Sequence, residues 1–162
     1  MNMQIKDVEP GPIVERWLED IEVGSTGTSG PITVTAEEII SFAERYDPLP
    51  MHTSEAGGAA TEHGGLIASG VLTIAFKQRL LMSIERNAAI IGAAMIESQV
   101  FKRPVRPGDE MFMRQTVVSK RESRSRPDRG IAVYDFEMTN QNGDTVLTSR
   151  DFVMVRRRPP AG

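Results

Sequence analysis

The chain has 162 residues, of which 40% are hydrophobic and 25% are charged, a balance typical of a soluble protein with one core. Its formal net charge of −3 gives no reason to expect nucleic acid as a partner, and it has no cysteine for disulfides or thiolate zinc sites. No run is apolar enough to span a bilayer, and the polar first residues are unlike a signal peptide. We therefore expect a cytoplasmic protein that binds neither nucleic acid nor membrane, with a single domain over residues 1–162 and a core from about 14 to 156.

The N-terminal part of the chain gives few structural signals. Residues up to about Pro12 are expected to fray, as chain ends commonly do. Residues 14–23 place apolar side chains among acids, and they fit either a loop that packs Trp17 or a short irregular strand. The β-branched residues 32–34 predict a short strand.

A helix is predicted over residues 35–46. Thr35 followed three residues later by Glu38 is a capping box, which marks a helix start. Four apolar or aromatic residues then recur at the spacing of one helical face, and the Asp47-Pro48 step ends the helix. These residues are Ile39, Phe42, Ala43 and Tyr46.

The stretch that follows this helix, Tyr46 to Thr53, holds an acid and a histidine five residues apart across two prolines. Proline fixes its own φ and moves the preceding residue out of the helical region. We therefore predict a stiff turn, not a helix interior, that fixes Asp47 relative to His52. Taken singly, Asp47 fits a helix-end cap and His52 a surface histidine; as a pair they indicate acid–base chemistry.

A long central helix is predicted from Gly70 to about Arg86. Its first half is apolar almost all round, which is typical of a buried helix. The small and polar residues 53–63 and the pair Gly64-Gly65 precede it as a loop.

The second half of the chain predicts the strands that wrap this helix. Alternation and apolar runs mark them, Gln141-Asn142-Gly143-Asp144 predicts a type I′ hairpin turn, and residues 156–160 are expected to be loose. The chain is therefore an α+β protein, with an antiparallel sheet wrapped around one long helix. An apolar run at 90–96 comes first. The expected strands are 99–105 with a break at Pro104, 110–120, 131–139 with Ala132, Tyr134, Phe136 and Met138 on one face, and 145–155, with a turn at 105–109 and a charged loop at 121–130.

From about Ile32 to Val155 the chain resembles the MaoC-like (R)-specific enoyl-CoA hydratases and dehydratases of the hotdog fold. The acid–histidine turn followed by the Gly-Gly…Ser-Gly helix entry carries most of this resemblance, and the Arg-Pro-Gly-Asp turn adds little, because many hotdog proteins share it. The matching pieces are Phe42-Ala43, residues 46–53, residues 64–70, Val105-Arg106-Pro107-Gly108-Asp109 and residues 123–128.

Two positions depart from the family pattern. The family's hydratases commonly read Asp-x-Asn-Pro-x-His, and this chain has Leu49 in place of the asparagine. Several members place a serine two turns into the central helix, and counting from Gly70 puts that place at about Gln78. Both departures bear on the substrate and the rate and leave the acid–histidine pair intact.

The resemblance implies an enzyme that adds water reversibly to a 2-enoyl thioester, of the kind used in fatty acid metabolism. Asp47 and His52 would exchange protons with water and substrate, and the Gly70 N–H at the positive end of the central helix would hold the thioester oxygen. Gly70 alone also fits tight helix–sheet packing. Coenzyme A enters only as part of the substrate, and no other cofactor and no metal is expected.

Four further residues are expected to contact the substrate: Leu49, Ser69, Arg124 and Arg126. The two arginines lie in a locally basic loop, which suits coenzyme A phosphates or a solvated hairpin. His63 fits either the border of the site or a solvent-facing loop.

The resemblance also implies at least a homodimer, because the family pairs with sites at the interface and a lone sheet exposes an edge. Two other functions remain open. A hotdog thioesterase would aim water at the carbonyl carbon, and a non-catalytic acyl-CoA-binding subunit would suit Leu49 and Gln78.

Overall fold

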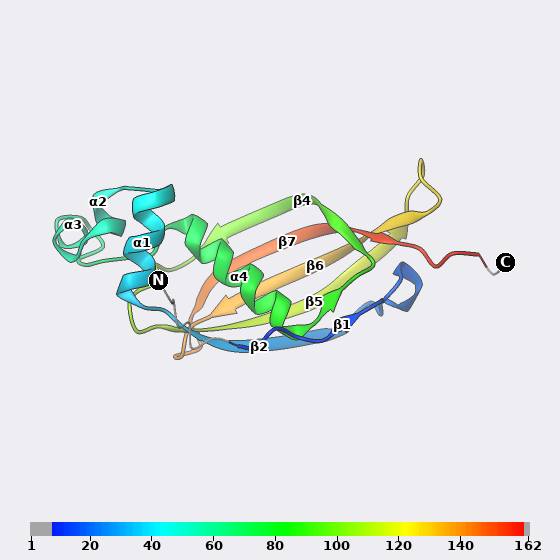
Figure 1. The fold of residues 1–162 in the computed structure, drawn as a ribbon, viewed down its shortest axis with the longest axis horizontal. Coiled ribbons are helices and arrows are strands. Elements are labelled where there is room, and N and C mark those ends of the chain that lie inside the picture. The colour runs from blue at the N-terminus through cyan, green and yellow to red at the C-terminus, as the bar shows by residue number, and fades with distance from the viewer. Residues whose placement is uncertain (1–7, 161–162) are drawn as a thin grey trace.

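The computed structural model describes residues 8–160, in which one five-stranded antiparallel sheet curves around one long helix (Figure 1). The strand order in the sheet is β2-β5-β6-β7-β4, and a separate parallel pair joins β1 to β3. No described helix is both long and apolar enough to cross a membrane. The elements are β1 Ile13–Val14, η1 Leu18–Asp20, β2 Thr26–Thr33, α1 Ala36–Tyr46, α2 Pro50–Thr53, α3 Glu55–Ala59, α4 Gly70–Ile84, β3 Arg86–Asn87, β4 Ile90–Phe101, β5 Glu110–Glu122, β6 Arg129–Thr139 and β7 Thr145–Arg156.

The core lies between α4 and the concave face of the sheet. Leu72, Phe76 and Leu80 of the helix are buried there, together with alternate residues of β5 and β6 such as Met113 and Phe136. This α+β arrangement is the hotdog fold expected from the sequence, and the expectation is confirmed. The helix is not covered all round in one chain, because its opposite face, which includes Val71, Ala75 and Gln78, is exposed.

The predicted first helix is confirmed as α1. The Thr35 hydroxyl accepts the Glu38 N–H at 3.2 Å, as the capping signal requires. Ile39 and Ala43 are fully buried against the core, and the helix closes with the Asp47 N–H on the Ala43 carbonyl at 2.9 Å. Packing on one face and a proline at the end therefore hold the residue that follows α1 in place.

The strands of the second half are confirmed with changes in detail. The apolar run 90–96 and the start of the predicted strand 99–105 form one strand, β4, because bulges absorb the irregular residues; the strand ends at Phe101, so the prediction is wrong for 102–105. One bulge lies at Ser98, the only described non-glycine residue with positive φ, at +53°. The charged loop is shorter than predicted, since β5 and β6 extend into it and leave 123–128.

The predicted hairpin after β6 is present, but the predicted type I′ turn is wrong. A type I′ turn needs positive φ at both central residues, and here only Gly143 has it, at +78°. The Asn140 side-chain oxygen instead accepts the N–H groups of Asn142 and Asp144, each at 3.0 Å. These two hydrogen bonds stabilise a loop longer than a two-residue turn. The spacing of residues in the sequence fits both kinds of loop, so it did not distinguish them.

The expected fraying before Pro12 is wrong for residues 8–12; residues 1–7 lie outside the described part. The Gly11 N–H donates to the Met82 carbonyl at 3.0 Å, and the Arg86 Nε donates to the Gly11 carbonyl at 2.8 Å. A Cβ on Gly11 would lie 2.6 Å from the Ser83 carbonyl oxygen, so this segment packs tightly on the end of α4. Residues 14–23 also form neither a plain loop nor a strand: they carry the end of β1 and the helical turn η1.

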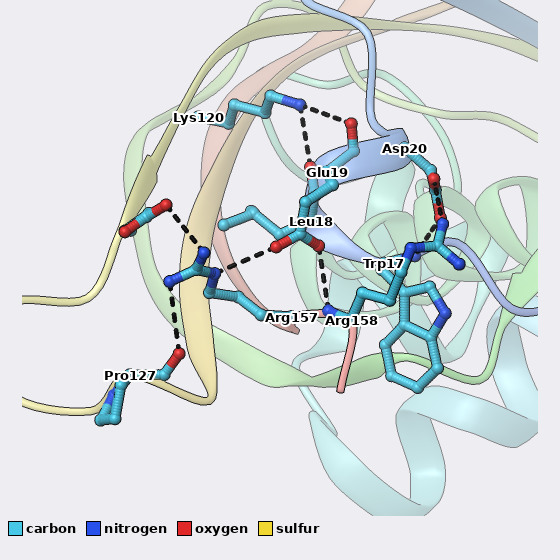
Figure 2. A network of polar contacts seen from close by, with 9 residues as sticks. Trp17, Leu18, Glu19, Asp20, Lys120, Pro127, Arg157 and Arg158 are labelled. Carbon is cyan, nitrogen blue, oxygen red and sulfur yellow. Dashed lines mark hydrogen bonds and ion pairs between the residues drawn. The ribbon is translucent and has the colours of Figure 1, made fainter. Parts of the chain in front are cut away.

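The C-terminal tail, expected to be loose, is tied to η1 (Figure 2). The Arg157 guanidinium pairs with Glu19 at 3.0 Å, and the Arg158 guanidinium pairs with Asp20 at 2.6 Å. The Arg158 N–H also donates to the Glu19 carboxylate at 3.0 Å. These partners are far apart in sequence, so the sequence pattern alone gave no sign of the tie.

We predict that Glu19→Gln destabilises the fold in a pH-dependent way. The Arg158 N–H and then the Arg157 guanidinium hold the pKa of Glu19 below its ordinary value of 4.5. Its stabilising effect is therefore complete above about pH 4.5 and disappears as the pH falls through the lower folded-state pKa. Because the Glu19 and Arg157 side chains lie at the surface, 40% and 30% exposed, water screens the pair, and we expect a loss below about 1 kcal/mol at pH 7 in urea unfolding. Glu22→Gln is the control, and an equal loss for both variants at every pH would contradict the tie.

Candidate active site

Asp47 occupies the position directly after α1. Its backbone N–H is held by the bond to the Ala43 carbonyl, and its non-helical backbone, with φ −156° and ψ 68°, turns the chain away from the helix before Pro48. The Asp47 side chain is 29% exposed, so its carboxylate is partly accessible to solvent.

His52 lies in α2, a single helical turn that begins at Pro50. The predicted stiff turn is therefore wrong for residues 50–53, because proline at the first helical position fits a helix and costs no hydrogen bond. His52 is 5% exposed, and its N–H donates to the Leu49 carbonyl at 2.9 Å.

The His52 ring is oriented by the backbone. Its Nδ1 lies 2.8 Å from the Ile67 carbonyl oxygen, which only accepts hydrogen bonds, so Nδ1 carries the proton in the neutral ring. Nε2 is then an acceptor, and it faces Asp47 with 3.8 Å between Nε2 and Oδ2. That distance is too long for a direct hydrogen bond. The structure thus brings together the predicted pair, with two acceptors pointing at one small space.

Ser69 joins this pair to the central helix. Its hydroxyl donates to Asp47 Oδ2 at 2.6 Å and accepts the Val71 N–H at 3.2 Å as the N-cap of α4. The one proton of the Ser69 hydroxyl is donated to Asp47. We expected Ser69 to contact the substrate, but in the structure it contacts the Asp47 carboxylate instead. The serine near Asp47 and His52 is therefore Ser69, at the N-cap of α4. Gln78, which occupies the position where several family members have a serine, lies on the exposed face of α4.

Gly70 opens α4 beside the pair. Its N–H, in the first turn, has no hydrogen-bond partner within the described residues 8–160. A Cβ there would lie 3.1 Å from the Phe101 ring, so a side chain would press on β4. Glycine at this place thus leaves a backbone donor open to a ligand.

A hollow of about 350 Å³ lies beside His52 and Gly70, and neither Asp47 nor Ser69 lines it. His52, Gly70 and Thr73 line it on the helical side, and the end of β4 and the residues after it line the other side. His63 is half-buried and also borders it, which favours the first of its two interpretations. Six lining residues were not assigned to the site by the sequence analysis, and all except Thr73 lie far from Gly70 along the chain: Thr73, Phe101, Lys102, Arg103, Pro104 and Val105.

None of the four expected substrate-binding residues lines this hollow in the same chain, and Ser69 is fully buried. Leu49 precedes α2, is 47% exposed, and does not line the hollow. Arg124 and Arg126 are exposed on the β5–β6 hairpin, at the opposite end of the sheet from α2 (Figure 1). The positive charge next to the hollow belongs instead to Lys102 and Arg103.

Comparisons with known proteins agree on one family. A protein-family model described as a MaoC like domain matches residues 22–136. The crystal structure of a MaoC-like dehydratase from Rhodospirillum rubrum is 40% identical, with a TM-score of 0.80 over 88% of this chain and 98% of that one. An (R)-hydratase from A. caviae involved in PHA biosynthesis is 26% identical, with a TM-score of 0.67 over 87% and 99%. The uncharacterised protein YdeM of Bacillus subtilis (strain 168) is 28% identical over 86% of this chain and 99% of its own length.

Proposed function

Because the chain belongs to the MaoC-like dehydratase family, we propose that it adds water reversibly across the C2=C3 bond of a 2-enoyl-CoA thioester. The observation that carries this proposal is the arrangement of Asp47 and His52. Their facing acceptor atoms are 3.8 Å apart, and His52 lines the hollow together with Gly70 at the start of α4. The (R)-hydratase among the similar structures supports the same reaction class.

The facing acceptors suit one water molecule that donates a hydrogen bond to each. On attack, the water oxygen bonds to C3, the pair accepts the proton that the water loses, and the C2=C3 electrons move toward the thioester carbonyl. A proton returned by the pair to C2 completes the addition, and the reverse sequence releases water. Proton transfer of this kind by positioned groups contributes about 10²–10⁴-fold to rate.

The charge that builds on the thioester oxygen needs a donor, and the Gly70 N–H suits that role. It is one of the unpaired first-turn groups of a long helix, where the helix dipole favours negative charge. Loss of a comparable donor raises a reaction barrier by about 3 kcal/mol.

Two basic residues suggest which way the substrate lies. Lys102 and Arg103 stand beside the hollow and are exposed, with the Arg103 side chain at 58%. Arginine and lysine bind phosphate well, so the phosphates of coenzyme A would lie on this outer side. The acyl group then points inward along α4. Coenzyme A is needed only as part of the substrate, and the enzyme works in the cytoplasm.

The free edge of β4 supports a homodimer. This strand ends the sheet order, and it exposes several large apolar side chains, an arrangement that invites pairing. A two-fold axis at this edge would run the two β4 strands antiparallel and bring the partner's β5–β6 hairpin to the end where the hollow lies. The partner's Arg124 and the partner's Arg126 would then face the outer part of coenzyme A. The exposed apolar residues of β4 are Met95, Ile96, Val100 and Phe101.

We predict that Asp47→Asn and His52→Ala each lower kcat for 2-enoyl-CoA hydration by at least about 10²-fold, because each removes a proton-transfer group. Absorbance of the enoyl thioester and mass spectrometry of the product together separate hydration, thioester cleavage and simple binding. His63→Ala is the control, since this histidine borders the same hollow without contacting Asp47, and it should keep most of the wild-type kcat. Wild-type rates in both Asp47 and His52 variants would show that the reaction occurs elsewhere.

We also predict a dimer in sedimentation that Ile96→Lys converts to a monomer. Ile96 is 48% exposed on β4, and an added charge there opposes edge pairing. Ile13→Lys is the control, because Ile13 is 70% exposed on β1, away from that edge. A wild-type protein that sediments as an active monomer, or equal effects of both substitutions, would overturn the assigned interface.

A further inference from the structure

One line of polar residues runs along the otherwise apolar buried face of α4. Ser69, Thr73 and Lys77 are four residues apart, so they lie on the same side of the helix. Their exposed fractions are 0%, 3% and 2%. Thr73 borders the hollow beside Gly70, so the line leads from the proposed reaction centre into the core.

At the inner end of the line, Lys77 meets two polar residues of β7. Its Nζ lies 2.6 Å from Asp151 Oδ2 and 3.0 Å from Ser149 Oγ, and the Ser149 hydroxyl donates to Asp151 Oδ1 at 2.9 Å. A buried ion pair of this kind adds little stability over apolar residues of similar volume. Folding alone therefore gives no reason for a charged pair at this place.

A neighbouring strand, β4, carries another buried polar group at the level of Ser149 in the sheet. Gln99 lies two residues before Phe101 on β4, and its Oε1 is buried without a hydrogen-bond partner among the described residues. Ser98 and Gln99 form a bulge of β4 that lies opposite Ser149, and the Ser149 hydroxyl accepts a hydrogen bond from Lys77. The flanking pairs are Glu97–Arg150 and Val100–Thr148.

The expected direction of the lysine side chain is toward the hollow, whose lining includes Thr73 but not Lys77, Gln99, Ser149 or Asp151. The Lys77 Cα is about 10 Å along the helix axis from Gly70, and helical side chains lean back toward the N-terminus. The ammonium group therefore lies near the turn that carries Thr73. Figure 1 shows α4 running back over the sheet from the end of β4 where Phe101 lies.

We propose that these residues, Lys77, Gln99, Ser149 and Asp151, form a polar floor that binds a hydroxyl group on the far end of a short acyl chain. The inference rests on the proposed function and names its substrate class: short 2-enoyl thioesters, or their hydrated products, that carry a further hydroxyl a few carbons beyond C3. The polar floor is then a specificity determinant, and it takes no part in the proton transfers.

The unmatched groups of the polar floor select for a hydroxyl. Lys77 has three N–H donors and gives two of them to Asp151 and Ser149; the third has no oxygen or nitrogen acceptor among the described residues, and the Phe136 ring centroid lies 4.7 Å from Nζ. A hydroxyl accepts from that N–H and donates to Gln99 Oε1. A methyl end would leave both groups unpaired. A carboxylate would bring a second negative charge to a cation that Asp151 already neutralises.

The test compares three saturated ligands of equal chain length: 6-hydroxyhexanoyl-CoA, hexanoyl-CoA and adipoyl-CoA. Calorimetry should show the hydroxylated ligand binding at least about tenfold more tightly than hexanoyl-CoA, with adipoyl-CoA weakest. The matching 2-enoyl-CoA substrates should follow the same order in kcat/KM. Equal affinities, or tightest binding of hexanoyl-CoA or adipoyl-CoA, would overturn the proposal.

Variants separate the polar floor from general packing. Lys77→Met with Asp151→Leu removes both charges together, which keeps the core free of an unpaired ion, and should abolish the hydroxyl preference while hexanoyl-CoA still binds. Gln99→Met should weaken the preference, and Gln78→Met, a glutamine on the exposed face of α4, should not. A preference that survives the double substitution would contradict the inference.

The two proposals fail in different ways. If no 2-enoyl-CoA is hydrated but the hydroxylated ligand still binds most tightly, the proposed reaction fails and the polar floor stands. If 2-hexenoyl-CoA is hydrated and the three saturated ligands bind with equal affinity, the proposed reaction stands and the polar floor fails.

Discussion

The hydrogen bond from Ser69 to Asp47 joins the end of α1 to the start of α4, and the geometry of the candidate site depends on it. The donor is the N-cap of α4 and the acceptor follows the last residue of α1, so two packed helices fix one carboxylate oxygen at 2.6 Å from the hydroxyl. Two residues earlier, the Ile67 carbonyl fixes the ring of His52. The segment 67–70 thus holds both members of the pair and ends in the Gly70 N–H.

That segment is itself fixed by bonds to distant parts of the chain. The Ile67 N–H donates to the Met51 carbonyl at 3.2 Å, and the Ala68 N–H donates to the Val105 carbonyl at 2.8 Å. The first bond ties it to α2, and the second ties it to the segment after β4. A pre-formed site of this kind costs little reorganisation during a reaction.

The parts of this site that the sequence predicted are those encoded by neighbouring residues. Asp47, His52 and Gly70 lie beside prolines, glycines and helix ends, where the backbone has few choices. The bond from Ser69 to Asp47 spans 22 residues, and Lys77 reaches Asp151 across 74, so neither is visible in local spacing. Arg124 and Arg126 show the converse: their charge pattern was plain, but it carried no information about which end of the sheet the hairpin occupies.

The fold was predictable for a similar reason. The capping signal of α1 and the apolar run of α4 are local and strong. The alternation of apolar and polar residues in β6 indicates which face of that strand is buried. The helical turn α2 depends on packing, and the prediction of a non-helical turn there was wrong. The contact of the C-terminal tail with Glu19 depends on a long-range pair, and the sequence analysis missed it. Sheet register and strand bulges, which join β4 into one strand, follow from neighbouring strands and not from β4 itself.

Hydration at this site requires that one thioester contact Asp47, His52 and the start of α4 at the same time. A crystal structure of the protein with an unreactive acyl-CoA tests this most directly. We predict that the thioester oxygen lies within about 2.7–3.1 Å of the Gly70 nitrogen, with C3 facing the space between Asp47 and His52. A thioester oxygen that points toward His63 or into solvent would contradict the account.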